Sequence, residues 1–261
     1  LKTFEQLKKE GYEVSYIGVD ENGIVDIEEL KRELREDTAL VSIMFVNNET
    51  GVIQPIKEIG EILEKKNIFF HTDAVQAIGK IDIFPKNLKI GAMTATAHKF
   101  YGPKGAGFVF IDKKYSIEKE ISGGPQERNR RAGTENVHGI QGLGVAIEEV
   151  YENFEEMVEK EGKLQNYLET KLKVEIAKLG KKIKINGEQA DRIKTTTNVY
   201  IEGADIQMLL VALDLRGICV SGGSACMSGS LENSHVLKAM GLNDEELKGS
   251  FRVSIGKDTT K

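Results

Sequence analysis

The chain has 261 residues, of which 40% are hydrophobic and 30% charged, a composition that supports one large or two ordinary folded domains. The formal net charge of −5 provides no overall attraction to nucleic acid or to an anionic membrane. The only cysteines, Cys219 and Cys226, are too few for a disulfide scaffold and favour a reducing compartment such as the cytoplasm. No apolar run approaches the ~18 residues of a membrane span.

The first part of the chain alternates predicted helices and strands. In chain order these are a helix over 3–10, a strand over 14–17, a helix over 26–35, a strand over 40–46, a helix from Pro55, and strands over 68–71, 92–97 and 107–111. The run Leu40–Val46 is apolar throughout, which is typical of a strand buried in a parallel sheet. The alternation predicts an α/β domain over residues 1–150, with ligands at the carboxyl ends of its strands.

The second part of the chain predicts a smaller α+β domain over residues 151–261. A helical region rich in Glu and Lys covers 137–179 and contains the domain join. After it come predicted strands over 182–185 and 195–201, a helix over 205–215, a strand over 217–220, a Gly/Ser-rich loop over 221–230, a helix over 234–240 and a strand over 250–255. Cys219 falls in the strand over 217–220 and is expected in the core.

Small and hydroxyl-bearing residues lead into a His-Lys pair where a predicted strand ends, in Thr94-Ala95-Thr96-Ala97-His98-Lys99. Burial at such a place lowers the pKa of a lysine and frees its amine to form a Schiff base. The small neighbours leave space for a bulky cofactor, and hydroxyl groups can bind its phosphate. A solvated surface lysine is the ordinary alternative for Lys99.

An acid follows another buried strand in Asp73-Ala74-Val75-Gln76. Asp73 at the edge of the sheet can keep a pyridinium nitrogen protonated, which makes that ring an electron sink. Gln76 can donate to a ring oxygen from the same side. The alternative for Asp73 is a helix N-cap.

Two further polar segments are weaker signals. Asn47–Gly51 follows the strand over 40–46, where a ligand contact and a plain turn are both possible. The segment Gly123–Thr134 holds three arginines and a Gly-Thr pair, which suit phosphate or carboxylate recognition but also occur in solvated basic loops.

Cys226 lies in the Gly/Ser-rich loop, an unusual place for a structural cysteine because structural thiols prefer apolar burial. Its position therefore favours a nucleophilic role. The four histidines have no HExxH or paired spacing, and the two cysteines do not form a zinc knuckle, so no metal site is predicted.

Together these segments resemble the cysteine desulfurases, pyridoxal-phosphate enzymes of fold-type I in the class-V aminotransferase family. The matching segments occur in the family's order and spacing: Asn47–Gly51, Asp73–Gln76, Thr96–Lys99, Tyr101–Gly105, Arg131–Thr134 and Ser224–Cys226. The loop Gly-Ser-Ala-Cys followed by Ser-Leu-Glu-Asn-Ser-His resembles the NifS- and IscS-like branch. Thr96 stands where a serine is common and keeps the hydroxyl group.

The resemblance implies how the cofactor is held. Lys99 would be the Schiff-base lysine and the base at the substrate Cα. Asp73 would bind the pyridine nitrogen and Gln76 the phenolic oxygen, with Asn48 near that oxygen and the substrate. Thr96 and His98 would bind the phosphate.

The resemblance also implies roles in substrate binding, assembly and sulfur transfer. Arg252 would bind the substrate carboxylate. Thr134 would reach the phosphate of a neighbouring subunit, which implies a homodimer. Cys226 would attack the substrate sulfur and carry it as a persulfide, so that L-cysteine becomes L-alanine. The sulfur would pass to an acceptor protein for iron–sulfur cluster assembly or tRNA thiolation.

The family pattern includes an earlier phosphate-binding turn with a ring-stacking histidine, and a final helix, which this sequence does not contain. The expectation is therefore an internal fragment of a longer cytoplasmic enzyme, inactive when isolated. Two alternatives remain open. One is another fold-type I enzyme, such as a selenocysteine lyase or an aminotransferase, which would share Asp73 and Lys99. The other is a partner-binding protein that uses the fold without a cofactor.

Overall fold

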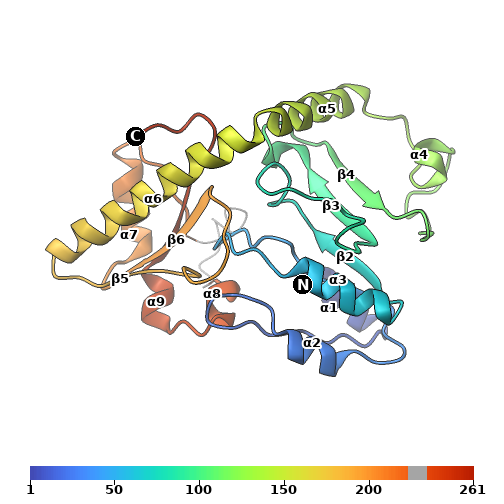
Figure 1. Ribbon diagram of the computed structural model, residues 1–261, viewed down its shortest axis with the longest axis horizontal. Coiled ribbons are helices and arrows are strands. Elements are labelled where there is room, and N and C mark those ends of the chain that lie inside the picture. Colours follow the sequence, from blue (N-terminus) through green and yellow to red (C-terminus); the bar gives the residue numbers. More distant parts are fainter. Residues whose placement is uncertain (223–233) are drawn as a thin grey trace.

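The computed structural model describes residues 1–222 and 234–261, which form two β-sheets joined by long helices (Figure 1). The first sheet contains β1 (Leu40–Ser42), β2 (Phe69–Asp73), β3 (Ala92–Thr96) and β4 (Gly107–Ile111) in that order. β1, β2 and β3 run parallel, and β4 pairs antiparallel with β3. The predicted α/β fold with a mainly parallel sheet is confirmed.

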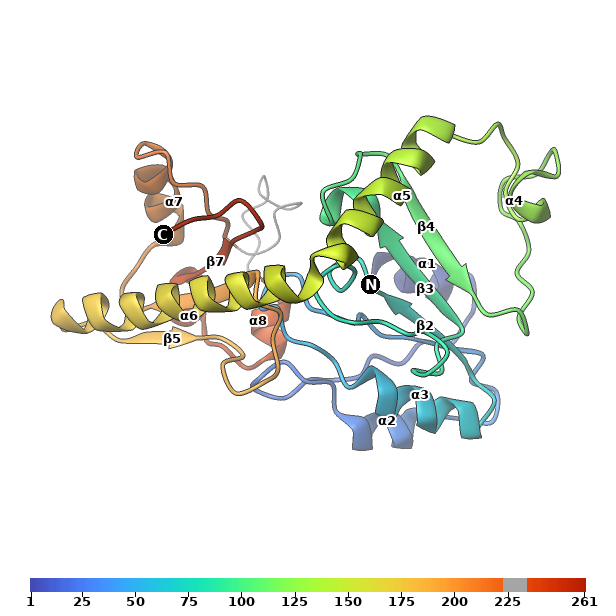
Figure 2. The same cartoon turned by 45° about the horizontal axis from the view of Figure 1, so that its top comes forward.

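The helices in this part of the chain are α1 (Lys2–Lys9), α2 (Ile27–Glu33), α3 (Ile56–Lys65), the short α4 (Gln126–Asn129) and α5 (Val137–Glu152). α5 lies on one side of the sheet and α3 with α2 on the other (Figures 1 and 2). The apolar stripe of α3 supplies Ile59 and Leu63, and α5 supplies Val150, to a core centred on Phe70 of β2. The 3.6-residue periodicity of α3 thus places its apolar face on the sheet.

The second sheet is antiparallel, with β5 (Ile183–Ile185), β6 (Thr196–Ile201) and β7 (Ser250–Ser254) in that order. The helices around it are α6 (Phe154–Lys178), α7 (Ile206–Asp214), α8 (His235–Ala239) and α9 (Asp244–Lys248). Ile185, Val199 and Phe251 form its buried centre. Within the described ranges, no helix combines the length and apolar character that crossing a membrane would require.

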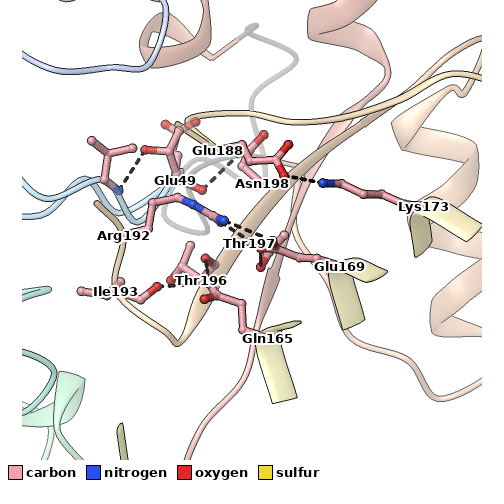
Figure 3. Close-up of polar contacts among 12 residues, drawn as sticks. Glu49, Gln165, Glu169, Lys173, Glu188, Arg192, Ile193, Thr196, Thr197 and Asn198 are labelled. Carbon is pink, nitrogen blue, oxygen red and sulfur yellow. Dashed lines mark hydrogen bonds and ion pairs between the residues drawn. The ribbon is translucent and has the colours of Figure 1, made fainter. Parts of the chain in front are cut away.

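Helix α6 spans from the first sheet to the second (Figure 2) and packs against β5 and β6 through polar side chains. Gln165 Nε2 donates to the carbonyl oxygens of Ile193 at 3.1 Å and Thr196 at 2.9 Å. Glu169 accepts two hydrogen bonds from the Arg192 guanidinium, at 2.9 and 3.1 Å (Figure 3). Four-residue spacing places Gln165 and Glu169 on one helix face, so α6 uses a polar stripe to fix the segment that precedes β6.

Backbone hydrogen bonds join the segment after β1 to the segment before β6. Ile53 N–H donates to Asp191 O at 2.8 Å, and Ile193 N–H donates to Gly51 O at 2.9 Å. Gly51 has a φ of +78°, and a Cβ there would lie 3.1 Å from the Thr196 side chain. Glycine therefore permits both the turn and the close approach of the two segments.

The structure differs from the expected elements at several places. Residues 14–17 and 217–220 form no strand, and the helical region over 137–179 is two helices that meet at Asn153. Helix α9, which begins with an Asn243 capping box, was not expected. Cys219 is exposed, so its assignment to the core is wrong. Its segment lacks strand pairing, which would have buried it, and the neighbouring Ile218 is 49% exposed.

The buried ion pair between Glu169 and Arg192 is expected to contribute more to stability than an exposed ion pair on the same helix. Replacing Glu169 with Ala should lower the free energy of unfolding by about 3–5 kcal/mol, because it leaves the Arg192 charge buried without its partner. Both side chains are nearly buried, at 12% and 9% exposure. Urea unfolding of the unaltered protein and of Glu169→Ala measures this difference in the free energy of unfolding.

The matched control is Glu159→Ala on the same helix, whose pair with Lys163 is exposed. This control should cost less than about 1 kcal/mol. Equal losses for the two variants would contradict a structural role for the buried pair.

Candidate functional site

The carboxyl ends of β1, β2 and β3 lie at one edge of the first sheet because the three strands are parallel. Past β1, Phe45 N–H donates to Asp73 O at 2.9 Å, and Ala74 N–H donates to Thr94 O at 2.9 Å. These two hydrogen bonds continue the pairing between neighbouring strands beyond the ends of β1 and β2. They bring together the segments that carry Asn48, Asp73 and Thr96.

Asp73 ends β2 with a half-buried side chain. Its Oδ1 accepts the Val75 N–H at 2.9 Å, and no described residue donates to its Oδ2. Residues 75–80 form turns, so the alternative of a helix N-cap is wrong for Asp73. His71 lies two residues earlier, and its Nδ1 is 2.8 Å from Ser42 Oγ. Burial lowers the pKa of His71, while the Asp73 charge opposes this shift. Asp73 thus keeps a carboxylate oxygen for a ligand at the sheet edge.

The next strand ends in a 3-10 turn over Ala97–Lys99. The Thr96 hydroxyl donates to Ala106 O at 3.2 Å and lies 3.0 Å from His98 Nδ1. The His98 side chain is exposed, and Lys99 is half-buried. Thr96 and His98 therefore form one polar group beside Lys99, as the predicted phosphate-binding role requires.

Gln76 forms a hydrogen bond that sequence reasoning did not predict. Lys80 Nζ donates to Gln76 Oε1 at 2.8 Å. Burial, together with the positive charges of Lys99 and Arg252, lowers the pKa of Lys80 to about 8, while the charge of Glu161 acts in the opposite direction. Lys80 and Lys99 also line one small cavity, so the two amines lie close together in the fold.

Glu161 is the acid whose charge acts on Lys80, and sequence reasoning missed it. Its side chain comes from α6 and is 1% exposed. Burial raises its pKa to about 7, although Lys80 and Lys160 act in the opposite direction. Glu161, Lys80 and Lys99 line a cavity of about 10 Å³, together with Thr195. Helix α6 thus brings a titratable carboxyl group from the second part of the chain to the cavity beside Lys99.

Arg252 reaches the same edge from β7. Its Nη1 donates to Asn48 O at 2.8 Å, which joins residues far apart in the chain. Its backbone exchanges two hydrogen bonds with Ser221, so the chain entering residues 223–233 is held beside it. The structure therefore brings Arg252 to Asn48, two residues predicted at the substrate.

The chain leaving residues 223–233 is also anchored near Asn48. Ser234 Oγ donates to Glu49 Oε2 at 2.5 Å, and Glu49 is 2% exposed. The side-chain amide of Asn198 in β6 donates to the backbone oxygen of Glu49 at 3.2 Å. Cys226 lies outside the described residues. Both chain ends that flank its segment are nevertheless attached next to the Asn48–Arg252 contact.

Thr134 is not joined to the other predicted site residues. It is exposed between α4 and α5, and within the described part of the chain no hydrogen bond links it to them. Among the described residues, no group of three or more His, Cys, Asp or Glu side chains is arranged to hold a metal ion.

The donors and acceptors at the sheet edge fit pyridoxal phosphate. The cofactor needs an acid at its ring nitrogen, an amine at its aldehyde and polar groups at its phosphate. Asp73 has a carboxylate oxygen to offer, Lys99 follows β3 as a half-buried amine, and Thr96 with His98 supply a hydroxyl and an imidazole. The chemistry at the edge therefore matches the three parts of the cofactor.

Comparison with known proteins identifies related sequences along the whole chain. Residues 1–261 match the family Aminotransferase class-V. Cysteine desulfurase IscS from Clostridium botulinum is 46% identical over 263 residues, which cover 100% of this chain and 65% of the relative. Cysteine desulfurase IscS from Methanosarcina thermophila is 47% identical, with coverage of 100% and 63%. The chain thus spans less than two thirds of the length of these relatives.

The fold is also similar to solved structures. A NifS-like protein from Rickettsia africae superposes with a TM-score of 0.84 at 37% sequence identity, covering 94% of this chain and 64% of that chain. This similarity extends over both sheets and identifies the fold as that of the fold-type I pyridoxal-phosphate enzymes.

The buried acid of α6 predicts how stability depends on pH. Because folding raises the pKa of Glu161 from 4.5 to about 7, the folded state binds more protons than the unfolded state between these values. The contribution of Glu161 to the free energy of unfolding is therefore most favourable at low pH and declines as the pH rises from about 4.5 to about 7. Glu161→Gln should remove this decline, which is on the order of 2 kcal/mol.

Urea unfolding at about pH 5 and pH 7 measures the difference. The control Glu156→Gln changes an exposed acid of the same helix and should behave as the unaltered protein does. A decline that persists in Glu161→Gln would show that other groups cause it.

Proposed function

The chain belongs to the class-V aminotransferase family, and we propose that it acts as the catalytic part of a pyridoxal-phosphate-dependent cysteine desulfurase of the NifS and IscS type. The proposed reaction takes L-cysteine and the Cys226 thiol to L-alanine and a Cys226 persulfide. The class-V aminotransferases use pyridoxal phosphate as their cofactor. The similarity to proteins named cysteine desulfurase over the whole chain supports this choice of reaction.

The observation that carries the proposal is that Ser221 and Ser234, which flank the segment with Cys226, are attached beside the candidate substrate site. Ser221 pairs with Arg252, Ser234 bonds to Glu49, and Arg252 contacts Asn48. The described residues before and after the segment that contains Cys226 are therefore both held next to the candidate substrate-binding residues Asn48 and Arg252. An aminotransferase needs no thiol there, whereas sulfur transfer does.

The proposed roles follow from the positions of the side chains. Bound pyridoxal phosphate supplies an electron sink for the bonds at the substrate Cα. Lys99 holds the cofactor through its amine and moves the proton at the substrate Cα. Asp73 keeps the ring nitrogen protonated, and Thr96 and His98 bind the phosphate.

Substrate binding and sulfur transfer use residues from three other segments. Arg252 binds the substrate carboxylate, for which its planar fork of donors is suited. Asn48 and Gln76 lie on the side of the cofactor's phenolic oxygen. The Cys226 thiolate attacks the substrate sulfur, and the C–S bond breaks with its electron pair going to the substrate carbon, which takes up a proton to give alanine. The sulfur remains on Cys226 as the persulfide.

The proposal includes a homodimer in which Thr134 binds the cofactor phosphate of the partner subunit. The exposure of Thr134 is compatible with a contact outside its own chain. The Cys226 persulfide passes its sulfur to an acceptor protein for iron–sulfur assembly or thiolation, in the reducing cytoplasm. Residues 1–150 form the cofactor-binding domain and residues 151–261 the smaller domain.

The two cysteines provide a direct test of sulfur transfer. Cys226→Ala in the full-length protein should abolish alanine formation from L-cysteine, because no thiol is left to accept the sulfur. Cys219→Ala removes an exposed thiol and should keep the activity. Alanine release and persulfide labelling measure both. Full activity in Cys226→Ala would favour a selenocysteine lyase or an aminotransferase instead.

Cofactor attachment is tested separately at Lys99. The full-length protein should show the visible absorption band of lysine-bound pyridoxal phosphate, and Lys99→Ala should lose it because no amine is left at that position. Lys104→Ala removes an exposed lysine from the same region and should keep the band. A band that survives in Lys99→Ala would assign the attachment to another residue, and no band in the unaltered protein would favour a partner-binding function.

A further inference from the structure

The contact between Lys80 and Gln76 fixes the orientation of the Gln76 amide, which the proposed function assigns to the cofactor. Lys80 Nζ donates to Gln76 Oε1 at 2.8 Å. An ammonium group has three donors and no acceptor, so only the oxygen end of the amide can satisfy it. The NH₂ end of Gln76, which has two donors, is therefore left for another partner.

Lys80 can do this only if it stays charged in a buried place. Burial and the neighbouring cations Lys99 and Arg252 all disfavour its ammonium form. Glu161 is the acid that opposes them, and it lines the same cavity of about 10 Å³ as Lys80. That volume is the space of one water molecule. Thr195 also lines the cavity, and its buried hydroxyl has no hydrogen-bond partner among the described residues.

We propose that Lys80 is a positioning residue of the desulfurase site: it holds Gln76 so that the amide NH₂ faces the phenolic oxygen of the cofactor, and Glu161 of α6 provides its counter-charge. This inference rests on the proposed function. A donor at the phenolic oxygen favours the ionised form of that oxygen. Lys80 thus acts on the cofactor through Gln76, not by contact.

The visible absorption band of the bound cofactor reports the ionisation of the ring system without requiring turnover. Losing one hydrogen bond of about 0.5–1.5 kcal/mol corresponds to a shift of roughly 0.5–1 pH unit. In the full-length protein with cofactor, Lys80→Met and Gln76→Ala should each raise the pH midpoint of the band by this amount. Lys80→Arg keeps a donor and should keep the midpoint.

A double-mutant cycle separates positioning from a direct charge effect. If Lys80 acts through Gln76, Lys80→Met adds no shift in the Gln76→Ala background. A full additional shift there would overturn the proposal, because it would mean that the Lys80 charge acts on the cofactor itself. Lys86→Met changes an exposed lysine nearby and should leave the midpoint unchanged.

Three further outcomes are informative. If Lys80→Met does not fold, the variant Lys80→Met/Glu161→Gln removes both buried charges and carries the same test. If the unaltered protein has the band and releases alanine but Lys80→Met keeps its midpoint, only this inference fails. If the unaltered protein has no band, the proposed function fails with it.

Discussion

The two sheets depend on one backbone junction, in which the segment after β1 pairs with the segment before β6. The hydrogen bonds from Ile53 to Asp191 and from Ile193 to Gly51 fix both segments without any side chain. Since Asn48 lies in the first segment and β6 pairs with the strand that carries Arg252, the junction sets the distance between these two residues. The candidate site exists because the sheets meet there.

Polar side chains make this junction specific. Glu49 and Asn198 are buried and form hydrogen bonds between the two parts of the chain, and the buried Gln165 of α6 holds the segment before β6. Buried polar groups are costly when unpaired, so any other docking of α6 or β6 would leave several of them unsatisfied. An apolar interface would allow the two parts of the chain to shift relative to one another. These directional hydrogen bonds instead favour one relative position of the two parts.

Local patterns predict most of the fold and part of the site. Period-3.6 apolar stripes located α3, and the apolar run after residue 39 located β1, because each depends on neighbours in sequence. Asp73 and Lys99 could be assigned to a sheet edge because parallel strands place their carboxyl ends together. The similarity to known enzymes supplied the roles, which strand positions alone do not contain.

The remaining features depend on contacts that no local pattern encodes. Asn48 and Arg252 are 204 positions apart, and their hydrogen bond follows only from the docking of the sheets. Glu161 is one of many acids in a helical region, and nothing nearby distinguishes it as the one that becomes buried. Cys219 was wrongly placed in the core, since a short apolar run predicts burial only where a partner strand covers it.

The placement of Arg252 and Asn48 on opposite sides of the junction has a thermodynamic consequence. A ligand held by both sheets binds only while they are docked, so its binding free energy adds to their cohesion. At a ligand concentration of 100 times Kd this addition is about 2.7 kcal/mol. A substrate bound by Arg252 and Asn48, as proposed above, would therefore hold the two sheets together, and the protein without this ligand is the form in which they separate most readily.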